Sequence, residues 1–495
     1  MTLPTGWVAT TIGEIAETKL GKMLDAAKNR GEPTPYLGNI NVRWGKFNLD
    51  NLSSMPVTVD ELETLAVRDG DLFVCEGGVP GRCAVWRHGP QRIVFQKAVH
   101  RIRPMADIDS DFVQRFLAWA AGQAAFDHLL TGTTIKHLPQ VGLQRISLPL
   151  PPLAEQRRIV AKLDTLTARL TRARTELDRV AAMAPRMAET AMRAGVTGKL
   201  TGKWRAAKPD RESVDQLLER ITTPQQGRGG REATDKVIVG TAALAVNDPG
   251  TPLPEGWAWV PLLRISKQET GHTPSRSHPE YWDGGVPWIG IRDAGAHHGR
   301  FIEQSMQTIS EAGLANSSAR MLPAGTVCLS RTASVGYVTI MGQRMATSQD
   351  FATWTCSDAL LPEYLMYALM AEGDDIRSFG MGSTHTTIYF PEVRAFNIAL
   401  PPVAEQAEIV AQIKVTIARA DRLEAEAACA RALLDRLEAA ILARAFRGEL
   451  VPQDPTDEPA AALLDRIRAT RAAAPKTQRG RRGATNGAQQ ESIDA

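Results

Sequence analysis

Cysteine is scarce in this sequence of 495 residues. The five cysteines are Cys75, Cys83, Cys328, Cys356 and Cys429. Their spacing is irregular and contains neither a CxxC pair nor histidines at the intervals of a zinc site. We therefore expect reduced cysteines that pack as small apolar side chains, and no bound metal. The adjacent His297 and His298 lie in a Gly/Ala-rich stretch without a carboxylate at useful spacing, which indicates an exposed loop.

Long hydrophobic runs are also missing. No stretch of about 18 apolar residues occurs, and no basic segment followed by an apolar one opens the chain. We expect no membrane partner, no secretory signal and a cytoplasmic location. A large charge excess is missing as well, since the formal net charge is +3. Because a nucleic-acid-binding protein needs a basic face rather than a basic total, this value neither supports nor excludes DNA as a partner.

The motifs of common catalytic centres are absent too. The sequence contains no G-x-x-x-x-G-K-[ST] phosphate loop, no HExxH zinc motif and no GxSxG nucleophile motif. Both Pro-Pro pairs belong to LPP motifs, so the Asn/Asp-Pro-Pro-Tyr motif of adenine methyltransferases does not occur. We therefore expect a protein without a catalytic centre of its own.

Against these absences stands an internal repeat. "LPPLAEQRRIV" at residues 150–160 returns as "LPPVAEQAEIV" at 400–410, an offset of 400 minus 150, or 250 residues. "LPTGW" (3–7) and "LPEGW" (253–257) keep that offset, as do "TGKL" (197–200) and "RGEL" (447–450). Between them, "GDLFVCEGGVPGR" from Gly70 matches "GTVCLSRTASVGY" from Gly325. The pattern indicates a tandem duplication that produces two similar domains.

Each half mixes short β-rich runs, such as "GDLFVCE" and "GTVCLSR", with helical runs, such as "DFVQRFLAWAAG" and "LPEYLMYALMAE". This mixture predicts an α+β domain, built twice. We place the first domain at residues 1–152, a first spacer helix at 153–195 and a linker at 196–252. The second domain follows at 253–402, a second spacer helix at 403–446, and a C-terminal segment with a disordered tail at 447–495.

After each LPP motif, apolar or small residues recur in alternating steps of four and three. A sustained seven-residue repeat is typical of a coiled coil, because a period of 3.5 residues keeps one narrow stripe facing a partner helix. We predict that the two helices pair with each other. The predicted seam includes Ile159, Leu163, Leu166, Leu170, Leu177, Val180, Ile409, Ile413, Leu423, Leu434, Leu437 and Ile441. The alternative is that each helix lies on its own domain.

The doubled LPP-[LV]-AEQ motif, the LPxGW openings and the "GDLFVCEGGVPGR" run resemble the specificity subunit of type I restriction–modification enzymes. The resemblance covers the chain to about residue 470. It implies two tandem target recognition domains, separated by an antiparallel coiled coil with approximate twofold symmetry. The expected function is recognition of a bipartite DNA sequence with a gap of fixed length. The rival interpretation is a coiled-coil scaffold that binds only proteins, and a stand-alone transcriptional reader is disfavoured because no helix-turn-helix is evident.

The resemblance also implies partners. Such a subunit has no catalytic centre and no cofactor, and binds double-stranded DNA together with two modification subunits. Those subunits bind S-adenosylmethionine and methylate adenine. Restriction subunits that use ATP and Mg²⁺ for translocation and cleavage complete the complex.

Polar residues in Gly-flanked loops are the candidates for DNA contact, since Arg and Lys suit guanine edges, Asn and Gln suit adenine, and phosphates accept from all of them. In the first domain we predict Lys22, Arg30, Asn41, Arg43, Arg82, Lys97, Thr133, Lys136 and His137. In the second domain we predict Thr273, Ser275, Arg276, Arg292, Arg331, Ser383, His385 and Thr386. An ordinary surface role remains the alternative for each. We interpret Trp44 and Trp288 as core residues rather than stacking platforms.

Overall fold

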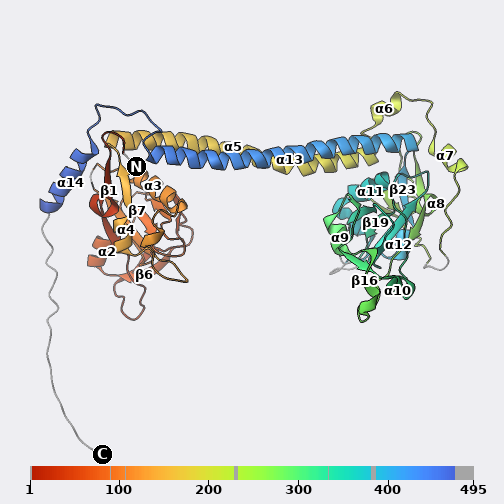
Figure 1. Cartoon of the computed structure of the whole chain (residues 1–495), viewed down its shortest axis with the longest axis horizontal. Helices are drawn as coiled ribbons and strands as arrows, with labels where there is room; N and C mark the ends of the chain where they lie inside the picture. Colours follow the sequence, from red (N-terminus) through yellow and green to blue (C-terminus); the bar gives the residue numbers. More distant parts are fainter. Residues whose placement is uncertain are drawn as a thin grey trace, which may run out of the picture. The chain divides into compact units, whose positions relative to one another are not determined.

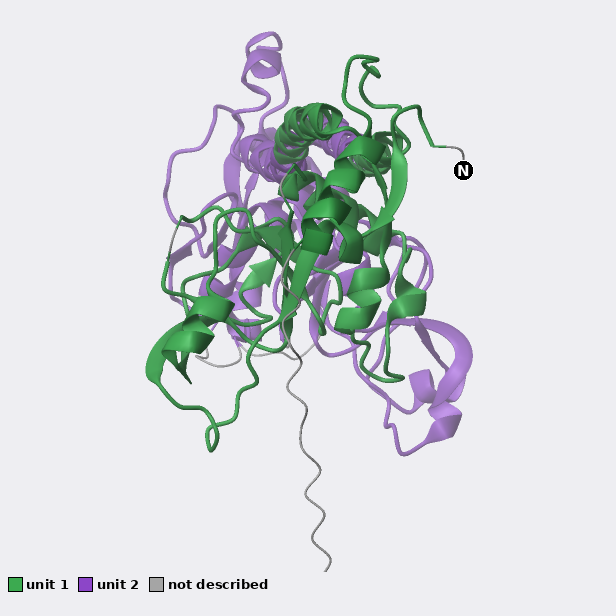
Figure 2. Ribbon diagram, turned by 90° about the vertical axis from the view of Figure 1, so that its left-hand side faces the viewer, with its two compact units in different colours: residues 1–175, 431–495 green, residues 176–430 purple. Residues whose placement is uncertain are grey.

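The computed structural model of the chain describes residues 3–89, 91–105, 107–227, 232–332, 334–380 and 386–473. The chain divides into two compact units (Figure 2). Unit 1 comprises residues 1–175 and 431–495, and unit 2 comprises residues 176–430. Two helices of 44 residues each, α5 (Leu153–Val196) and α13 (Val403–Phe446), contribute to both units (Figure 1). Among the described residues, no helix is both long and apolar enough to cross a membrane.

Unit 1 is built around a four-stranded antiparallel sheet in the order β2-β10-β7-β8. Its strands are β2 (Ala16–Leu20), β10 (Val99–Pro104), β7 (Leu72–Cys75) and β8 (Cys83–Val85). All four residues of β7 are buried, but they alternate between two cores. Leu72 and Val74 pack in one core with helix α3 (Ser110–Gly122), whereas Phe73 and Cys75 face the other. The alternation follows from the two-residue period of a strand.

The second core of unit 1 lies beneath a smaller sheet in the order β6-β3-β9, made of Ser53–Val57, Glu32–Leu37 and Val94–Phe95. Strand β1 (Val8–Thr11) pairs with β11 (Ser147–Leu150), and β4 (Val42–Arg43) pairs with β5 (Lys46–Phe47). The remaining elements are α1 (Ile12–Ile15), α2 (Val59–Leu65), η1 (Asp127–Leu129), α4 (Gln140–Arg145) and α14 (Ala460–Ala473). Helix α14 packs Leu463, Leu464 and Ile467 into the same core as α3.

Unit 2 repeats this plan. Its main sheet has the order β15-β22-β19-β20-β17. The strands span Ser266–Glu269, Phe351–Cys356, Val327–Ser330, Val338–Met341 and Phe301–Ile302. As in β7, alternate residues of β19 enter different cores, Val327 and Leu329 on one face and Cys328 on the other. A smaller sheet, β18-β16-β21, consists of Gln307–Ile309, Trp282–Ile289 and Ala346–Thr347.

The helices of unit 2 are short except for its parts of α5 and α13. They are α6 (Gly202–Ala206), α7 (Val214–Arg220), α8 (Leu262–Ile265), α9 (Ile291–Ala296), α10 (Glu311–Ala315), α11 (Pro362–Ala371) and α12 (Phe390–Arg394), with 3-10 turns η2 (Pro279–Tyr281) and η3 (Gly373–Phe379). Helix α11 buries most of its surface in the core of the main sheet, the place that α3 takes in unit 1.

The segment predicted as a linker, 196–252, contains regular secondary structure that the sequence pattern did not predict. It supplies β12 (Ile238–Val239) and β13 (Leu244–Val246), which join β23 (Phe396–Leu400) and β14 (Ala258–Pro261) in a four-stranded sheet. The Glu372 carboxylate accepts backbone N–H groups of residues 241–244 at 2.6–3.2 Å. Strands of two and three residues are too short to produce a readable periodicity, so the sequence pattern could not reveal them.

Among the described residues of unit 1, no strand pairs with β11 as β13 pairs with β23. Ala399 of β23 donates its N–H to the Ala243 carbonyl at 2.9 Å. At the corresponding position of β11 stands Pro149, as the two strand pairings Ala9 with Pro149 and Trp259 with Ala399 show. Proline has no N–H to donate, so it closes this edge of unit 1 to a further strand.

Within each unit, α5 and α13 pair in antiparallel fashion. In unit 1, Arg174 donates to Asp435 and Glu438 at 2.6 and 2.7 Å. In unit 2, the end of α5 meets the beginning of α13, where a Cβ on Gly195 would lie 2.9 Å from the side chains of Ile409 and Ile413. The glycine therefore permits close approach of the two helices. The alternative, in which each long helix lies only on its own domain, is wrong for both units.

The predicted seam is buried at some positions and open at others. Ile159, Leu163, Leu170, Ile409 and Ile413 are buried, whereas Leu423 and Leu437 are 37% and 49% exposed. The Leu423 and Leu437 side chains, which were predicted in the seam, are therefore not buried by the helix pair. A pair of helices encloses only a narrow stripe, and positions at its margin remain in contact with solvent.

The repeated motifs meet at one junction in each unit. In unit 1, the indole of Trp7 donates to the Glu155 carboxylate at 3.0 Å, and in unit 2 Trp257 donates to Glu405 at the same distance. Burial, the largest cause, raises the pKa of Glu155, and the hydrogen bond from Trp7 opposes this. LPxGW and LPPxAEQ thus recur because an aromatic donor and a buried acceptor lock each domain to its long helix.

The glutamine of each AEQ motif completes the junction. Gln156 donates to the Pro151 carbonyl and accepts the N–H of Asp109, the N-cap of α3. Gln406 donates to the Pro401 carbonyl and accepts the N–H of Leu361, the N-cap of α11. Each glutamine amide therefore holds the start of the long helix against the start of the domain's own core helix.

The glycines of TGKL and RGEL close the same junctions. Gly198 and Gly448 have φ angles of 73° and 76°, which favour glycine. A Cβ at Gly198 would lie 2.6 Å from Cγ of Pro254, and one at Gly448 would lie 2.5 Å from Cγ of Pro4. The end of each long helix therefore needs glycine to fit beneath an LPxGW motif.

We expect Gly198→Ala to destabilise unit 2 by about 2 kcal/mol, through backbone strain and overpacking. Thermal unfolding should show a fall in Tm of roughly 4–8 °C. Gly202→Ala is the matched control, because nothing lies within 4 Å of its would-be Cβ and its φ is not positive. An equal effect of both substitutions would contradict the close packing inferred at Gly198.

Candidate nucleic-acid interface

Both units carry the same β-hairpin turn at one end of the main sheet. In unit 1 it links β7 to β8, with Cys75 N–H donating to the Arg82 carbonyl at 2.8 Å. In unit 2 it links β19 to β20, with Ser330 N–H donating to the Tyr337 carbonyl at 2.8 Å. The backbone frame is thus repeated, while the side chains at the turn differ.

Two further loops meet this hairpin turn in each unit. Leu138 N–H donates to the Glu76 carbonyl at 2.7 Å, and Ile388 N–H donates to the Arg331 carbonyl at 2.9 Å. These bonds bring the loops that precede α4 and α12 beside the turn. The third loop follows β3 in unit 1 and β16 in unit 2. We refer to the three loops of each unit together as the loop cluster.

The third loop is held by the same hydrogen bond in both units. Gly38 N–H donates to Asn41 Oδ1 at 2.8 Å, and Gly290 N–H donates to Asp293 Oδ2 at 2.9 Å. Asn41 and Asp293 are 5% and 2% exposed. This pair therefore shapes the loop in each unit and gives a secure point for aligning the two halves.

The glycines of "EGGVPGR" let the three loops of unit 1 pack closely. A Cβ on Gly77 would lie 2.9 Å from Nδ1 of His137, and one on Gly78 would lie 2.9 Å from Nδ2 of Asn39. Asn39 Nδ2 also donates to the Gly77 carbonyl at 2.6 Å. The turn is therefore held between its two neighbours, which fixes the position of side chains around it.

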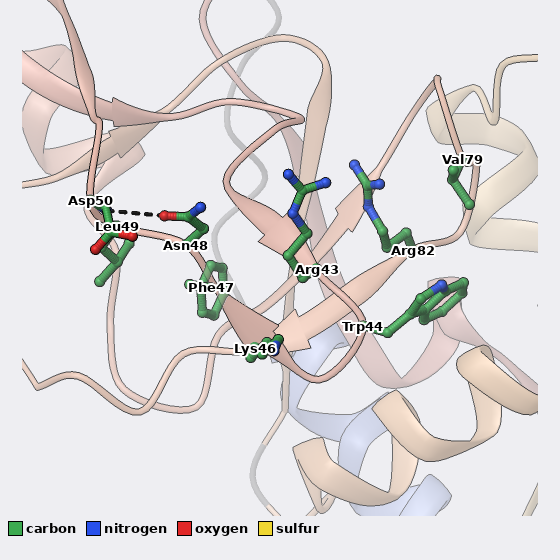
Figure 3. Close-up of a pocket in the computed structure, with 9 residues that line it drawn as sticks. All are labelled: Arg43, Trp44, Lys46, Phe47, Asn48, Leu49, Asp50, Val79 and Arg82. Atoms are coloured by element: carbon green, nitrogen blue, oxygen red, sulfur yellow. Dashed lines mark hydrogen bonds between the residues drawn. The ribbon is translucent and has the colours of Figure 1, made fainter. Parts of the chain in front are cut away.

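An open hollow of about 650 Å³ lies on the loop cluster of unit 1 (Figure 3). It is lined by Arg43, Trp44, Lys46, Phe47, Asn48, Leu49, Asp50, Val79 and Arg82. Three of these side chains are basic and one is acidic, and the Trp44 ring is 44% exposed. A cationic surface with an accessible aromatic ring suits phosphates and base edges.

The comparisons with known proteins agree with this geometry. A family model described as "Type I restriction modification DNA specificity domain" matches residues 4–179 and 254–427. The chain belongs to this family. Each match begins at an LPxGW motif and extends into a long helix. The two stretches together span more than half of this specificity-family chain. Because the same family model matches each half, the chain contains two copies of the specificity domain.

Relatives cover almost the whole specificity-family chain. The type I restriction enzyme EcoKI specificity subunit of Escherichia coli is 26% identical over 500 residues, which cover 95% of this chain and 97% of the relative. The StySPI specificity subunit of Salmonella potsdam is 24% identical, with coverage of 95% and 96%. The solved HsdS subunit from Thermoanaerobacter tengcongensis has a TM-score of 0.58 and 22% identity, covering 91% of this chain and 99% of its own, and it shares the fold.

The predicted DNA contacts in unit 1 of the specificity-family chain fall into two groups. Six side chains are exposed: Arg30, Arg43, Lys97, Thr133, Lys136 and His137. Arg82 is partly buried and donates to the Asn39 carbonyl at 2.7 Å. Arg30 donates to carbonyls of its own loop, and Lys136 lies 3.5 Å from Asp127. Arg43, Arg82, Thr133 and His137 belong to the loop cluster.

Two predicted contacts in unit 1 require correction. Asn41 is buried and its amide is engaged on both sides, by Gly38 N–H and by the Asn48 carbonyl. The Lys22 side chain is only 10% exposed and donates to Glu61 and the Pro56 carbonyl. The hydrogen-bonding groups of both side chains are thus engaged by protein atoms instead of DNA. Both residues therefore stabilise loops of unit 1.

In unit 2, several predicted residues gather near Gln349. Thr273 donates to its side chain at 2.6 Å, and Arg331 donates to its carbonyl at 3.0 Å. Arg276 stacks on the Trp282 ring at 4.5 Å. Ser275 and Arg292 are exposed and Thr386 is partly buried. Ser383 and His385 lie outside the described residues.

Some residues of the interface were missed or misread from the sequence. Trp44 was interpreted as core, yet it is exposed at the tip of the β4–β5 hairpin, whereas Trp288 is buried at 4%. The signal was the neighbouring Gly45, which has a φ of 67° and marks a turn. His298, in the adjacent histidine pair, accepts the Val338 N–H at its Nδ1 at 3.0 Å. The described residues contain no cluster of His, Cys, Asp and Glu suited to a metal ion.

We expect Lys22→Met to reduce stability and to leave DNA affinity unchanged. The hydrogen bond from Lys22 is the main cause that lowers the pKa of Glu61 below its ordinary 4.5. A lowered carboxyl pKa contributes stability above that ordinary value, which is lost as pH falls through the folded-state pKa. The loss should be about 1 kcal/mol or less, because Glu61 is 38% exposed.

Thermal unfolding between about pH 3 and pH 7 measures this effect. At acidic pH, the Tm of the variant should change less with pH than the Tm of the wild type. Lys97→Met is the control, since Lys97 is exposed and was predicted to bind DNA. A fall in DNA affinity for Lys22→Met as large as for Lys97→Met would return Lys22 to the interface.

Proposed function

We propose that this chain reads a bipartite DNA target within a type I restriction–modification complex, with one loop cluster for each part of the target. The observation that carries this proposal is the repeated frame with different side chains. The same hairpin, the same loop-holding hydrogen bond and the same junction occur twice, but Arg82 corresponds to Tyr337 and Glu76 to Arg331. Two similar readers with different chemistry suit a target of two different parts.

Loop clusters are supported as the reading surface by their composition. In unit 1, the hollow on the loop cluster combines arginine, lysine and an exposed aromatic side chain with glycines that allow close approach. Contacts to phosphates fix the position of a protein on the duplex, while contacts to base edges provide the sequence preference. We assign the first role to exposed lysines such as Lys46 and Lys97, and the second to residues at the hairpin turns.

The chemistry of modification and cleavage belongs to partners in this proposal. Two modification subunits would bind S-adenosylmethionine and methylate one adenine in each part of the target, and restriction subunits would use ATP and Mg²⁺. A methyltransferase must extrude its adenine from the duplex. This chain would hold the flanking base pairs while that happens, in the cytoplasm, where the DNA is.

Sequencing of modified bases in cells that express the chain with its modification subunits tests the proposal. We expect one split motif that contains adenine in both parts. Cells with the modification subunits alone should lack it. A protein-only scaffold would leave the modified-base pattern unchanged when this chain is removed, and that result would contradict the proposal.

Binding of the assembled complex to DNA provides a second measurement. Affinity should fall steeply with salt, because neutralised phosphates release counterions. The isolated chain should bind weakly, since the second domain alone has 10 basic against 14 acidic residues over 253–400. Tight, salt-insensitive binding by the isolated chain would contradict the assignment of phosphate contacts.

A further inference from the structure

Two neighbouring positions at the loop cluster differ sharply between the units. Counting from Asn41 and Asp293, which make the same hydrogen bond, Arg43 corresponds to Gly295. Counting from Cys75 and Ser330, which begin the same hairpin turn, Arg82 corresponds to Tyr337. We call residues 43 and 82, and their counterparts 295 and 337, the variable pair.

Members of the variable pair lie side by side in both units. In unit 1, Arg43 and Arg82 line the same hollow, and Figure 3 shows their guanidinium groups pointing the same way. In unit 2, a Cβ on Gly295 would lie 3.5 Å from the Tyr337 ring. The proximity in unit 2 supports the alignment independently of the hollow in unit 1.

In unit 1 the variable pair places two cations in the same hollow. No ion pair joins Arg43 or Arg82 to an acidic residue of the described chain. The hollow has three basic side chains against Asp50 alone, a formal balance of 3 minus 1, or +2. Like charges at close range repel unless acceptor atoms lie between or above them. The arrangement is therefore suited to a ligand with several hydrogen-bond acceptors.

The two arginines differ in how firmly they are held. Arg82 donates one Nη to the Asn39 carbonyl at 2.7 Å, and its Nε is buried without a protein partner. Arg43 is exposed on strand β4. The Arg82 guanidinium is thus held in one orientation by its loop, whereas the Arg43 guanidinium is exposed and can adjust its position. Together they can orient a bound ligand and contact it closely.

We propose that the variable pair is a specificity determinant, and that Arg43 and Arg82 select guanine in the part of the target read by unit 1. This inference rests on the proposed function. Guanine presents two acceptors, O6 and N7, in the major groove, and the fork of arginine donates to both. Lysine also donates to guanine, but its ammonium group lacks the planar fork that holds arginine to both acceptors at once.

Unit 2 has no cation at these two positions. Tyr337 is 37% exposed and packs its ring against His298 at 5.8 Å. A phenol hydroxyl donates or accepts a single hydrogen bond, so the pair in unit 2 does not select guanine in the same way. The two parts of the target should therefore differ at the base that faces the variable pair.

Phosphate is the rival source of acceptor atoms. A side chain that grips phosphate weakens binding to all sequences alike, whereas one that reads a base relaxes the preference at a single position. Lys46 provides the matched control, since it lines the same hollow and carries the same charge but lies outside the variable pair.

The test uses the complex with its modification subunits. Modified-base sequencing is combined with competition binding on duplexes that differ at one base pair. For Arg43→Gln, we expect selectivity for guanine at one position to fall about 10- to 100-fold, with the other part of the motif unchanged. For Lys46→Gln, we expect weaker binding to every duplex and an unchanged motif.

Arg82→Lys is the second variant, because it keeps the charge but loses the fork. It should reduce the same guanine preference. Should the hairpin lose stability in this variant, the exposed Arg43 still decides the question. Equal effects of Arg43→Gln and Lys46→Gln on all duplexes, or a wild-type motif without guanine in either part, would overturn the inference. Absence of any split motif for the wild-type complex would instead refute the proposed function.

Discussion

Ending the chain after Val451 is expected to unfold unit 1, whereas ending it after Ala473 should leave its stability unchanged. Helix α14 places Leu463, Leu464 and Ile467, all 4% exposed or less, in the core that contains α3. Burying one such side chain contributes about 1.5–3 kcal/mol, so the three together provide roughly 5–9 kcal/mol. This equals a large part of the 5–15 kcal/mol by which a domain is usually stable.

Limited proteolysis of the full chain and of both truncated chains measures the effect. Peptides from residues 8–150 should become accessible only when α14 is missing, and those from 258–400 should stay protected. The shorter chain also loses the hydrogen bond from Gln453 to Glu155 and the ion pair between Arg158 and Asp457. A milder substitution, Leu463→Ala, should cost about 2–5 kcal/mol. Equal protection of unit 1 in both truncated chains would disprove the role of α14.

The second large effect concerns the gap in the DNA target. We expect that one extra heptad in both α5 and α13, inserted after Thr175 and after Ala430, lengthens the gap by roughly three base pairs. Seven helical residues add about 10.5 Å, and base pairs are spaced about 3.4 Å apart. A whole heptad preserves the seam. Three base pairs also rotate the duplex by roughly a third of a turn, so methylation should be slower.

Modified-base sequencing again provides the measurement. Both parts of the motif should keep their bases while the number of unread positions between them changes. The control is the same heptad in α5 alone, which leaves the two helices unequal and should abolish methylation. A motif with an unchanged gap in the doubly extended chain would show that the helices do not set the spacing.

The repeat made most of the fold predictable. Because LPxGW and LPPxAEQ recur with a constant offset, the sequence alone indicates two domains and two long helices. The structure adds the reason, which is the bond from Trp7 to Glu155 and its copy from Trp257 to Glu405. Strands β12 and β13 escaped prediction because they are short. The backbone beside them is also held by hydrogen bonds to Glu372, a residue more than 120 positions away.

The reading surface was less predictable. Residue type and a nearby glycine predict DNA contact for Arg43 and Arg82, and both side chains line one hollow in the structure. Asn41 fits the same criteria but is buried as a loop-holding residue. Its burial, its own hydrogen bonds and the equivalent bond at Asp293 distinguish it from a base-reading asparagine. A single sequence contains no sign of which loop side chain turns inward, because tertiary contacts decide that.

The two junctions have a consequence for heredity. Since Trp7 with Glu155 and Trp257 with Glu405 form the same hydrogen bond in the two units, a crossover within the codons for those motifs would keep each junction intact. Such an exchange delivers an intact reader to a new neighbour, with its core helix and its lock preserved. One recombination event would therefore produce a chain with a new combination of two existing domains.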